Sequence, residues 1–588
     1  MSSLYERLGG TDLRLLTVSV HDGATTSLEL RTYPRTSAPE YDAVSYTWGA
    51  DISTTSVMCN RVPLEIRTNL FRALPFIHDI RPEPRTRPLW IDAICLNQNN
   101  SDEKAIHVPH MNEIYENASR TLVWLGEAAH NSDLAMDNME SLTQKLLTVK
   151  NPSSLSIQQR LTNYDLPLLN DQKWEALKVL QLRPWFYRLW TLQEIVLSKE
   201  AILLCGRKSI SWDALVALHQ AAMQAELHIM VKAEADPEPP YKNAQVVIHH
   251  VEFLRKHSNI MTLPELLMLS ADRGYSVPVD RVWALLGLLN KGYQQSIRDA
   301  ELVDYSEAAI SKYHETFLSI VKFHIKHDRA LAMRIIENNL RTVCNPLLPS
   351  WCPDWHTDRG GIPLARWPEA LAGIPGGEFR RIEPFMQVKE DSSLELCGLM
   401  VDVIDCVTKS AGQGLLDLES YPWLTECLEI IKSTAFVPYD VYPTSAAIPA
   451  IPTTLAGGSP IHELRQKYMR AEEVLKYVLY PPGTLLKTSP RTILRCNGRK
   501  FFRTKAGRLG IGPANLEKND LLCSMYGART LWALRPREPS EKARGQQVGE
   551  FSRPDTKEQE FELLGSAYTA SLLKGEAWLE SLPYADTK

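Results

Sequence analysis

A carboxylate ends a row of aromatic side chains near position 190. Phe186, Trp190 and Glu194 are spaced i, i+4 and i+8, so a helix through this segment would place them along one face. Burial beside an indole raises the pKa of a carboxyl and strengthens its hydrogen bonds, which suits a group that binds sugar hydroxyls or stabilises a cationic transition state. The alternatives are that Glu194 is exposed, or that it pairs with Arg188 or Lys199.

Polar residues also follow three apolar segments of the chain. Trp48 comes at the end of the first, Asp92 at the end of the second with Asn97 and Gln98 shortly after it, and Glu127 follows the third. Parallel sheets bind ligands beyond the carboxyl ends of their strands, so we expect these groups at one edge of a sheet. The alternatives for Asp92 are that it caps the following turn or pairs with an arginine.

The segments that must position these residues alternate between strand and helix patterns. Three stretches are apolar at successive positions, which indicates strands buried on both faces of a parallel sheet, at residues 43–48, 89–94 and 121–125. Helical spacing between them, at residues 70–80 and 111–118, gives the order β-α-β-α-β. A hairpin is predicted before them at residues 13–20 and 27–33, and after them come predicted helices at 172–182 and 184–198 and a strand at 201–205.

Length and composition indicate a globular protein of more than one domain. The chain has 588 residues, of which 44% are hydrophobic and 23% charged, with a formal net charge of -5. We expect an α/β N-terminal domain with a mostly parallel sheet flanked by helices, a largely helical middle region and a β-rich C-terminal region. The expected parts are a β-hairpin flap at 1–40, the α/β domain at 41–206, the helical region at 207–340, and the β-rich region at 341–588 with a disordered loop near 437–460.

Several classes of protein are disfavoured by what the sequence lacks. It has no G-x-x-x-x-G-K-[ST], H-E-x-x-H or G-x-S-x-G motif, which argues against P-loop nucleotidases, zinc proteases and serine hydrolases. His107 and His110 have no companion at metal-ligand spacing, so we expect no metal and no cofactor. The near-neutral charge, and the interpretation of the basic stretch 499–505 as a strand with a charged outer face, give no reason to expect nucleic-acid binding.

Cysteine usage and hydropathy predict a cytoplasmic protein. Ten cysteines are scattered without a C-x-x-C pair, which is typical of reduced thiols. The first residues lack the apolar core of a signal peptide. The apolar runs are shorter than the roughly 20 residues of a membrane helix, so we expect no membrane span.

Five blocks of the sequence resemble, in order, the fungal heterokaryon incompatibility (HET) domain. They are YDAVSYTWG at 41–49, LWIDAICLNQ at 89–98, the segment from Met111 through Ile114-Tyr115 to Ala118, VWLG at 123–126, and RPWF with RLWTLQE at 183–194. Further blocks at 280–287, 348–355 and 565–576 look like those downstream in long HET proteins. His107, where the family often has Gln, and residues 276–279, which replace a stretch often carrying Asp-Pro-Arg, depart from the pattern.

The resemblance implies a fold and a chemistry. HET domains are similar to Toll/interleukin-1 receptor (TIR) domains and serve in fungal non-self recognition, which ends in programmed cell death. Some TIR domains cleave NAD with a glutamate from a W-x-x-x-E-like helix, and the segment from Trp190 to Glu194 is similar to that motif. By this analogy Glu194 would be catalytic, and the substrate-binding residues would be Ser45, Trp48, Asp92, Asn97 and Trp190.

Two functions remain open at this level. In the first, the protein is a cell-death effector that hydrolyses the nicotinamide glycosidic bond of NAD, with Glu194 stabilising oxocarbenium charge, Trp48 or Trp190 stacking on a ring, and Asp92 orienting or pairing. In the second, the same domain is a non-enzymatic signalling module that assembles with itself or with partner proteins.

Overall fold

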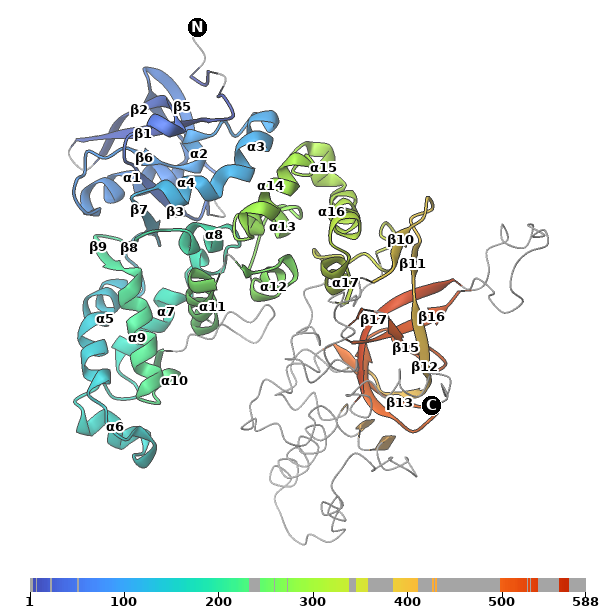
Figure 1. Ribbon diagram of the computed structural model, residues 1–588. Coiled ribbons are helices and arrows are strands. Elements are labelled where there is room, and N and C mark those ends of the chain that lie inside the picture. Colours follow the sequence, from blue (N-terminus) through green and yellow to red (C-terminus); the bar gives the residue numbers. More distant parts are fainter. Residues whose placement is uncertain are drawn as a thin grey trace, which may run out of the picture. The chain divides into compact units, whose positions relative to one another are not determined.

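The computed structural model divides the chain into two compact units, Met1–Tyr313 and His314–Lys588, which are described separately (Figure 1). The structure describes residues 4–6, 8–21, 24–49, 52–231, 244–257, 260–271, 273–337, 345–357, 384–410, 423, 426–427, 429–430, 498–525, 527–528, 530–537 and 560–569. The loop predicted near 437–460 lies outside these residues. No helix among them is both long and apolar enough to cross a membrane.

A nine-stranded mixed sheet forms the centre of the first unit, in the order β5-β4-β2-β1-β6-β3-β7-β8-β9. The strands are β1 (Asp12–His21), β2 (Ala24–Pro34), β3 (Asp42–Tyr46), β4 (Thr54–Cys59), β5 (Val62–Arg67), β6 (Leu89–Trp90), β7 (Arg120–Trp124), β8 (Ala201–Cys205) and β9 (Lys208–Ser211). β3 pairs in parallel with β6 and β7, and β7 pairs in parallel with β8. The predicted parallel core and the β-α-β-α-β order are therefore confirmed.

The central strands are buried on both faces, as their unbroken apolar runs predict. Every residue of β3 and of β8 is buried. Helix α1 (Thr68–Ile80) packs against the sheet with Leu70, Ala73, Leu74 and Ile77, whose i, i+3, i+4, i+7 spacing makes one apolar face. Helices α2 (Asp92–Cys95), α3 (Ser101–His107) and α4 (Met111–Asn117) connect β6 to β7.

The hairpin predicted as an N-terminal flap is present, but its strands belong to the sheet. β1 and β2 pair along their length, and β1 also pairs with β6 at Leu16 and Leu89. A second hairpin, β4–β5, which the sequence pattern did not reveal, precedes α1 and extends the sheet beyond β2. The sheet is therefore larger than the segments predicted from apolar runs alone.

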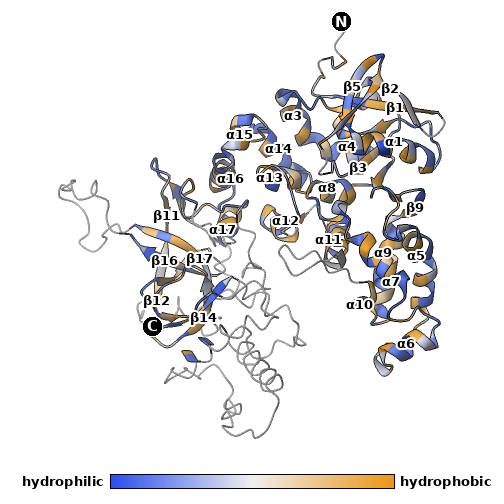
Figure 2. Ribbon diagram, turned by 180° about the vertical axis from the view of Figure 1, so that it is seen from behind, coloured by the Kyte–Doolittle hydropathy of each residue, from blue (hydrophilic) through white to orange (hydrophobic). Residues whose placement is uncertain are grey.

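Helices make up most of the remainder of the first unit. They are α5 (Ser132–Leu147), α6 (Ile157–Asn163), α7 (Gln172–Gln181), α8 (Trp190–Val196), α9 (Trp212–Gln224), α10 (His228–Val231), α11 (Ala244–His257), α12 (Leu263–Leu269), α13 (Asp280–Leu286), α14 (Lys291–Asp299) and α15 (Glu307–Ser311). α5 packs against α7 and α9, and the hydrophobic residues of α9 stand out in Figure 2. The predicted helical middle region is confirmed.

The single helix predicted over 184–198 is wrong in its first half. Pro184–Tyr187 form a 3-10 helix, Arg188 is extended, and α8 starts at Trp190. The interruption comes from a distant segment, because Gly274 N donates to Tyr187 O at 2.6 Å and Leu189 N donates to Gly274 O at 2.8 Å. Phe186 is consequently not part of a helical row with Trp190 and Glu194.

Among the described residues of the second unit, the elements with defined bounds are two helices, a two-stranded sheet and a barrel. The helices are α16 (Tyr313–His327) and α17 (Arg329–Glu337), and β10 (Met386–Val388) pairs with β11 (Leu394–Leu396). The other strands close an antiparallel barrel, in the order β12-β13-β14-β17-β16-β15, with Ile404, Phe502, Leu522 and Leu564 in its core. Their bounds are β12 (Gly398–Val407), β13 (Arg499–Thr504), β14 (Leu509–Pro513), β15 (Leu521–Met525), β16 (Leu531–Pro536) and β17 (Phe561–Thr569). The β-rich C-terminal region is confirmed.

Candidate functional site

The candidate site lies beyond the carboxyl ends of β3 and β6. β3 lies between β6 and β7. After β3 the chain passes through β4, β5 and α1 to β6 on one side of β3, and then crosses to β7 on the other side. Such a point of reversal is where open α/β sheets bind ligands. Ser45 comes from the end of β3, Asp92 is the first residue of α2 just after β6, and Glu194 comes from α8, which packs against β3.

A chain of hydrogen bonds joins three of the residues at this point. The indole N–H of Trp185 donates to Ser45 Oγ at 2.7 Å, and the Ser45 hydroxyl donates to Glu194 Oε2. Ser45 and Glu194 are 1% and 3% exposed, so the alternative of a solvent-exposed Glu194 does not hold. The bond engages Oε2, and no described residue donates a hydrogen bond to Oε1.

Burial dominates the electrostatics of Glu194. Loss of water raises its pKa from 4.5 to about 7, and the negative charge of Asp92 adds to the rise. The positive charge of Arg188 and the hydrogen bond from Ser45 oppose the rise without cancelling it. A carboxyl with a pKa near 7 can take up and release a proton at neutral pH.

Asp92 and Trp48 form a second pair at the same edge. The indole N–H of Trp48 donates to Asp92 Oδ2 at 3.2 Å, and the guanidinium of Arg67 lies 5.9 Å from the centre of the Trp48 ring. Asp92 Oδ1 accepts from the backbone N–H of the next residue, Ala93, at 2.7 Å. Burial raises the pKa of Asp92, and Arg188 lowers it in part.

Arg188 provides the positive charge of the site. Its side chain donates to the backbone carbonyl of Tyr46 at 2.7 Å. From this position it lowers the pKa of Glu194, Asp92 and Asp280, whose carboxyls come from three different helices. No ion pair between Glu194 and Arg188 is present among the described residues, and Arg188 acts on Glu194 through its charge, as it does on the other two carboxyls.

A buried hydroxyl faces the same charges. Tyr46 is almost fully buried, and its hydroxyl has no hydrogen-bond partner among the described residues. Burial raises its pKa well above 10, and the charges that act on it include those of Asp92, Arg188 and Glu194. A buried donor without a partner costs free energy, so a ligand or water that accepts from Tyr46 would be stabilised here.

The structure places the two other predicted residues at the margins of the cluster. Trp190 is half-buried and interacts through a side-chain hydrogen bond with Asp280 of α13. Asn97 accepts from the backbone N–H of Asn99 at 3.1 Å, and its own N–H donates to Glu103 at 2.8 Å. Asn97 thus stabilises a turn after α2 and is linked to Glu103 rather than to Glu194.

Sequence reasoning missed three residues of the cluster, namely Trp185, Tyr46 and Asp280. All three lie in blocks that resemble HET proteins, so the resemblance marks their segments, but it gives these residues no role. Among the residues that the structure describes, no group of three or more His, Cys, Asp or Glu is arranged to hold a metal ion. His110 Nδ1 donates to Glu113 Oε1 at 2.9 Å, so its ring takes part in a polar contact with a carboxylate.

Comparisons with known proteins identify part of the chain. Residues 41–194 match the family model described as "Heterokaryon incompatibility protein (HET)", which confirms the resemblance drawn from the five blocks. The chain is also similar to "Heterokaryon incompatibility protein 6, OR allele" of Neurospora crassa, with 26% identity over 372 residues that cover 55% of this chain and 54% of that protein. The chain therefore spans about half the length of this curated relative. No solved structure matches, and the likeness to TIR domains stays a prediction.

Proposed function

From the HET match as premise, we propose that the protein is a fungal heterokaryon incompatibility effector that acts in the cytoplasm and promotes cell death by hydrolysing NAD. The curated relative is named for heterokaryon incompatibility, and the family match covers the segment that holds Ser45, Asp92 and Glu194. The observation that carries the enzymatic part is the buried Trp185–Ser45–Glu194 chain, which fixes a carboxyl with a pKa of about 7 at the carboxyl edge of the sheet.

In the proposed reaction, the bond between nicotinamide and ribose C1′ breaks and its electron pair leaves with nicotinamide. The ionised form of Glu194 accepts hydrogen bonds from the ribose hydroxyls through Oε1 and stabilises the positive charge that develops on the ribose. Water then adds to C1′ and transfers its proton to Glu194, which returns it to solvent. The products are nicotinamide, ADP-ribose and one proton.

The neighbouring residues have roles in binding. Trp48, fixed by its hydrogen bond to Asp92, and Trp190 offer ring faces for the nicotinamide or adenine. Tyr46 offers its hydroxyl to a ligand oxygen, and Ser45 holds Glu194 in one orientation. Asn97 stabilises the turn beside Asp92.

The test uses the full chain expressed in a fungal host. Glu194→Ala should leave cellular NAD and survival at the level of uninduced cells, whereas the wild type should lower both. Asp405→Asn is a matched control, because Asp405 is a carboxylate of the barrel whose arginine partner, Arg503, lies at 2.5 Å. Toxicity of Glu194→Ala equal to that of the wild type, with NAD unchanged in both, would reject the enzymatic function.

A second candidate function is assembly without catalysis. It is supported by three leucines on the helical part of the first unit that are each at least half exposed, namely Leu147, Leu168 and Leu169. In this case death follows from association with copies of the chain or with partner proteins. Toxicity would then survive Glu194→Ala and be lost when these leucines are replaced by serine.

A further inference from the structure

A segment outside the family match holds the backbone of the candidate site. Gly274 bonds on both sides of Arg188, through Tyr187 O and Leu189 N, and forms an isolated parallel bridge with Arg188. Arg273 adds a bond from its guanidinium to Arg188 O at 3.1 Å. Arg188 is extended at these contacts, and its side chain donates to Tyr46 O at the end of β3.

Asp280 comes from the same downstream segment and faces the site residues. It is the first residue of α13, it is buried, and Tyr305 donates to its Oδ1 at 3.1 Å. Trp190 interacts with the same carboxyl through a side-chain hydrogen bond, and Arg188 is the charged group that acts on it. α13 packs directly against α8, the helix that carries Trp190 and Glu194.

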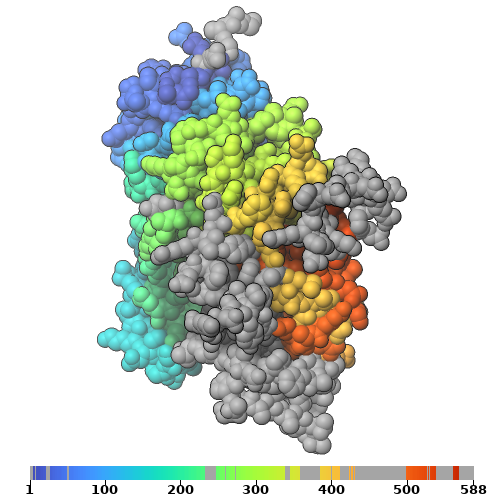
Figure 3. Space-filling model, turned by 45° about the vertical axis from the view of Figure 1, so that its right-hand side comes forward, coloured from blue at the N-terminus to red at the C-terminus, as the bar shows by residue number. Residues whose placement is uncertain are grey.

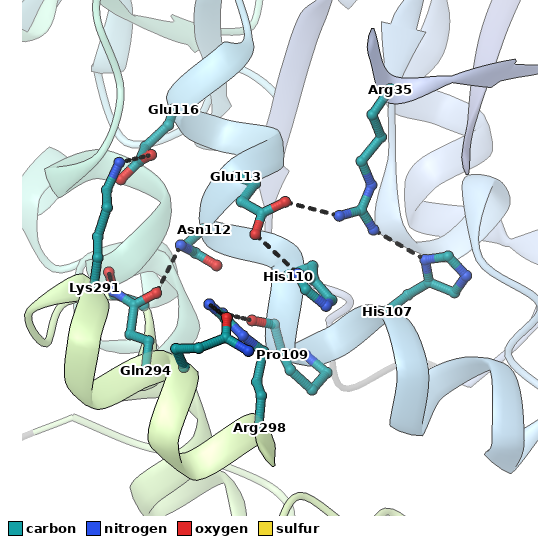
Figure 4. A network of polar contacts seen from close by, with 12 residues as sticks. Arg35, His107, Pro109, His110, Asn112, Glu113, Glu116, Lys291, Gln294 and Arg298 are labelled. Atoms are coloured by element: carbon teal, nitrogen blue, oxygen red, sulfur yellow. Dashed lines mark hydrogen bonds and ion pairs between the residues drawn. The ribbon is translucent and has the colours of Figure 1, made fainter. Parts of the chain in front are cut away.

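Further contacts make this segment part of the same body as the α/β sheet. Gly287 N donates to Gln193 Oε1 of α8 at 3.1 Å. Figure 4 shows α14 against α4, where Asn112 donates to Gln294 at 3.0 Å and Lys291 lies 3.6 Å from Glu116. In Figure 3 the yellow-green residues near 300 border the blue N-terminal residues on the surface of this unit.

We propose that Asp280 is a positioning residue of the candidate site, which fixes the ring of Trp190 and balances Arg188, so that the functional unit extends beyond the family match to about residue 305. The effect of Asp280 on turnover rests on the proposed function. The coupling of Asp280 with Trp190 and Arg188 does not. Asp280 does not touch substrate. It acts through Trp190, on which a ring of the substrate stacks, and through Arg188, whose charge Glu194 and Asp92 share.

The first experiment measures NAD hydrolysis by the full chain. Asp280→Asn should raise KM about tenfold with a smaller change in kcat, because Trp190 then interacts with a neutral amide oxygen in place of a carboxylate, which holds this binding residue less tightly. Asp299→Asn, at the exposed end of α14, is the matched control and should leave KM and kcat unchanged. An Asp280→Asn enzyme with wild-type KM would overturn the proposal.

The second experiment does not depend on activity, so it separates failure of this inference from failure of the proposed function. Thermal midpoints at pH 7.5 are compared for the wild type, Asp280→Asn, Arg188→Gln and the double variant. Without Arg188, Asp280 is a buried carboxylate with no balancing charge. Asp280→Asn should therefore shift the midpoint upward by at least about 2 °C more in the Arg188→Gln background than in the wild-type background. An equal shift in both backgrounds would overturn the link. If Arg188→Gln does not fold, Tyr305→Phe takes its place, because it removes the bond to Asp280 Oδ1. It should change the midpoint less in the Asp280→Asn background than in the wild type, and an equal change in both would overturn the link.

Discussion

Two buried glutamates of the same unit, Glu103 of α3 and Glu194 of α8, have opposite electrostatic behaviour. They are 7% and 3% exposed, so burial alone would raise the pKa of both. Arg14 donates to both oxygens of Glu103, at 2.6 and 3.1 Å, and with Asn97 N it lowers the pKa below 4.5. Glu194 has only Ser45 as a hydrogen-bonding partner in the described residues and shares Arg188 with other carboxyls, so its pKa rises to about 7. A buried carboxylate that has its own cationic partner stays ionised and serves the structure. A buried carboxylate without such a partner can exchange a proton near neutral pH.

The largest expected effect breaks the structural pair. Arg14→Met leaves Glu103 charged and buried without its cation, which should lower the free energy of unfolding of the first unit by about 3–5 kcal/mol in urea denaturation. Arg31→Met is the control, because Arg31 pairs with Glu29 on the surface, where solvent screens the pair, and its loss should leave the free energy of unfolding nearly unchanged. Equal costs for the two variants would show that burial does not distinguish them.

The next effect concerns Glu194 and depends on pH. Because its pKa in the folded state is raised, Glu194 favours folding below about pH 4.5 and this contribution is lost as the pH rises through 7. Glu194→Gln should therefore be more stable than the wild type at pH 8 by on the order of 1–3 kcal/mol, and no more stable at pH 4.

Glu103→Gln is the matched control for that change. Because the pKa of Glu103 is lowered by Arg14, its charged form favours folding, and its loss should destabilise the unit at pH 7. Urea denaturation across the pH range measures both variants. Parallel pH profiles for the two would remove the distinction between the glutamates.

The smallest effect sharpens the role of Ser45. Ser45→Ala leaves the buried N–H of Trp185 without its acceptor, which should cost about 1–2 kcal/mol, and removes the hydrogen bond that favours ionised Glu194. The pKa of Glu194 should consequently rise above 7, and the pH dependence of stability should move to higher pH. Thr143→Ala also removes a buried hydroxyl, one bonded to Met139 O, and should leave that pH dependence in place.

The sequence revealed the core of the fold because that core has a local signature. β3, β7 and β8 are buried on both faces, so their segments are apolar at successive positions, and α1 and α7 show helical spacing. β6 has only two residues in strand conformation, so the strand predicted at 89–94 is too long. The β4–β5 hairpin has no run of successive apolar residues, so the sequence pattern does not predict it. The break at Arg188 could not be read locally, because Gly274, far along the chain, causes it.

The site was less predictable for the same reason. Ser45 and Glu194 are 149 residues apart, and no periodicity links them. They were brought together in the prediction by the resemblance to the HET family, which placed both in recognised blocks. The sequence predicts Arg188 only as an alternative partner of Glu194, and it gives no role to Asp280, which lies in the downstream block 280–287. Only the folded chain brings these two residues to α8.

The central claim is that Glu194 performs the chemistry of NAD hydrolysis. The most direct measurement is the release of nicotinamide from NAD at pH 7 by the purified full chain and by its Glu194→Gln variant, with circular dichroism to verify that both are folded. We expect release by the wild type and a rate about 100- to 1000-fold lower for the variant, the loss typical of one preorganised electrostatic group. Equal rates for the two proteins, or no release by the wild type at any concentration of NAD, would contradict the claim.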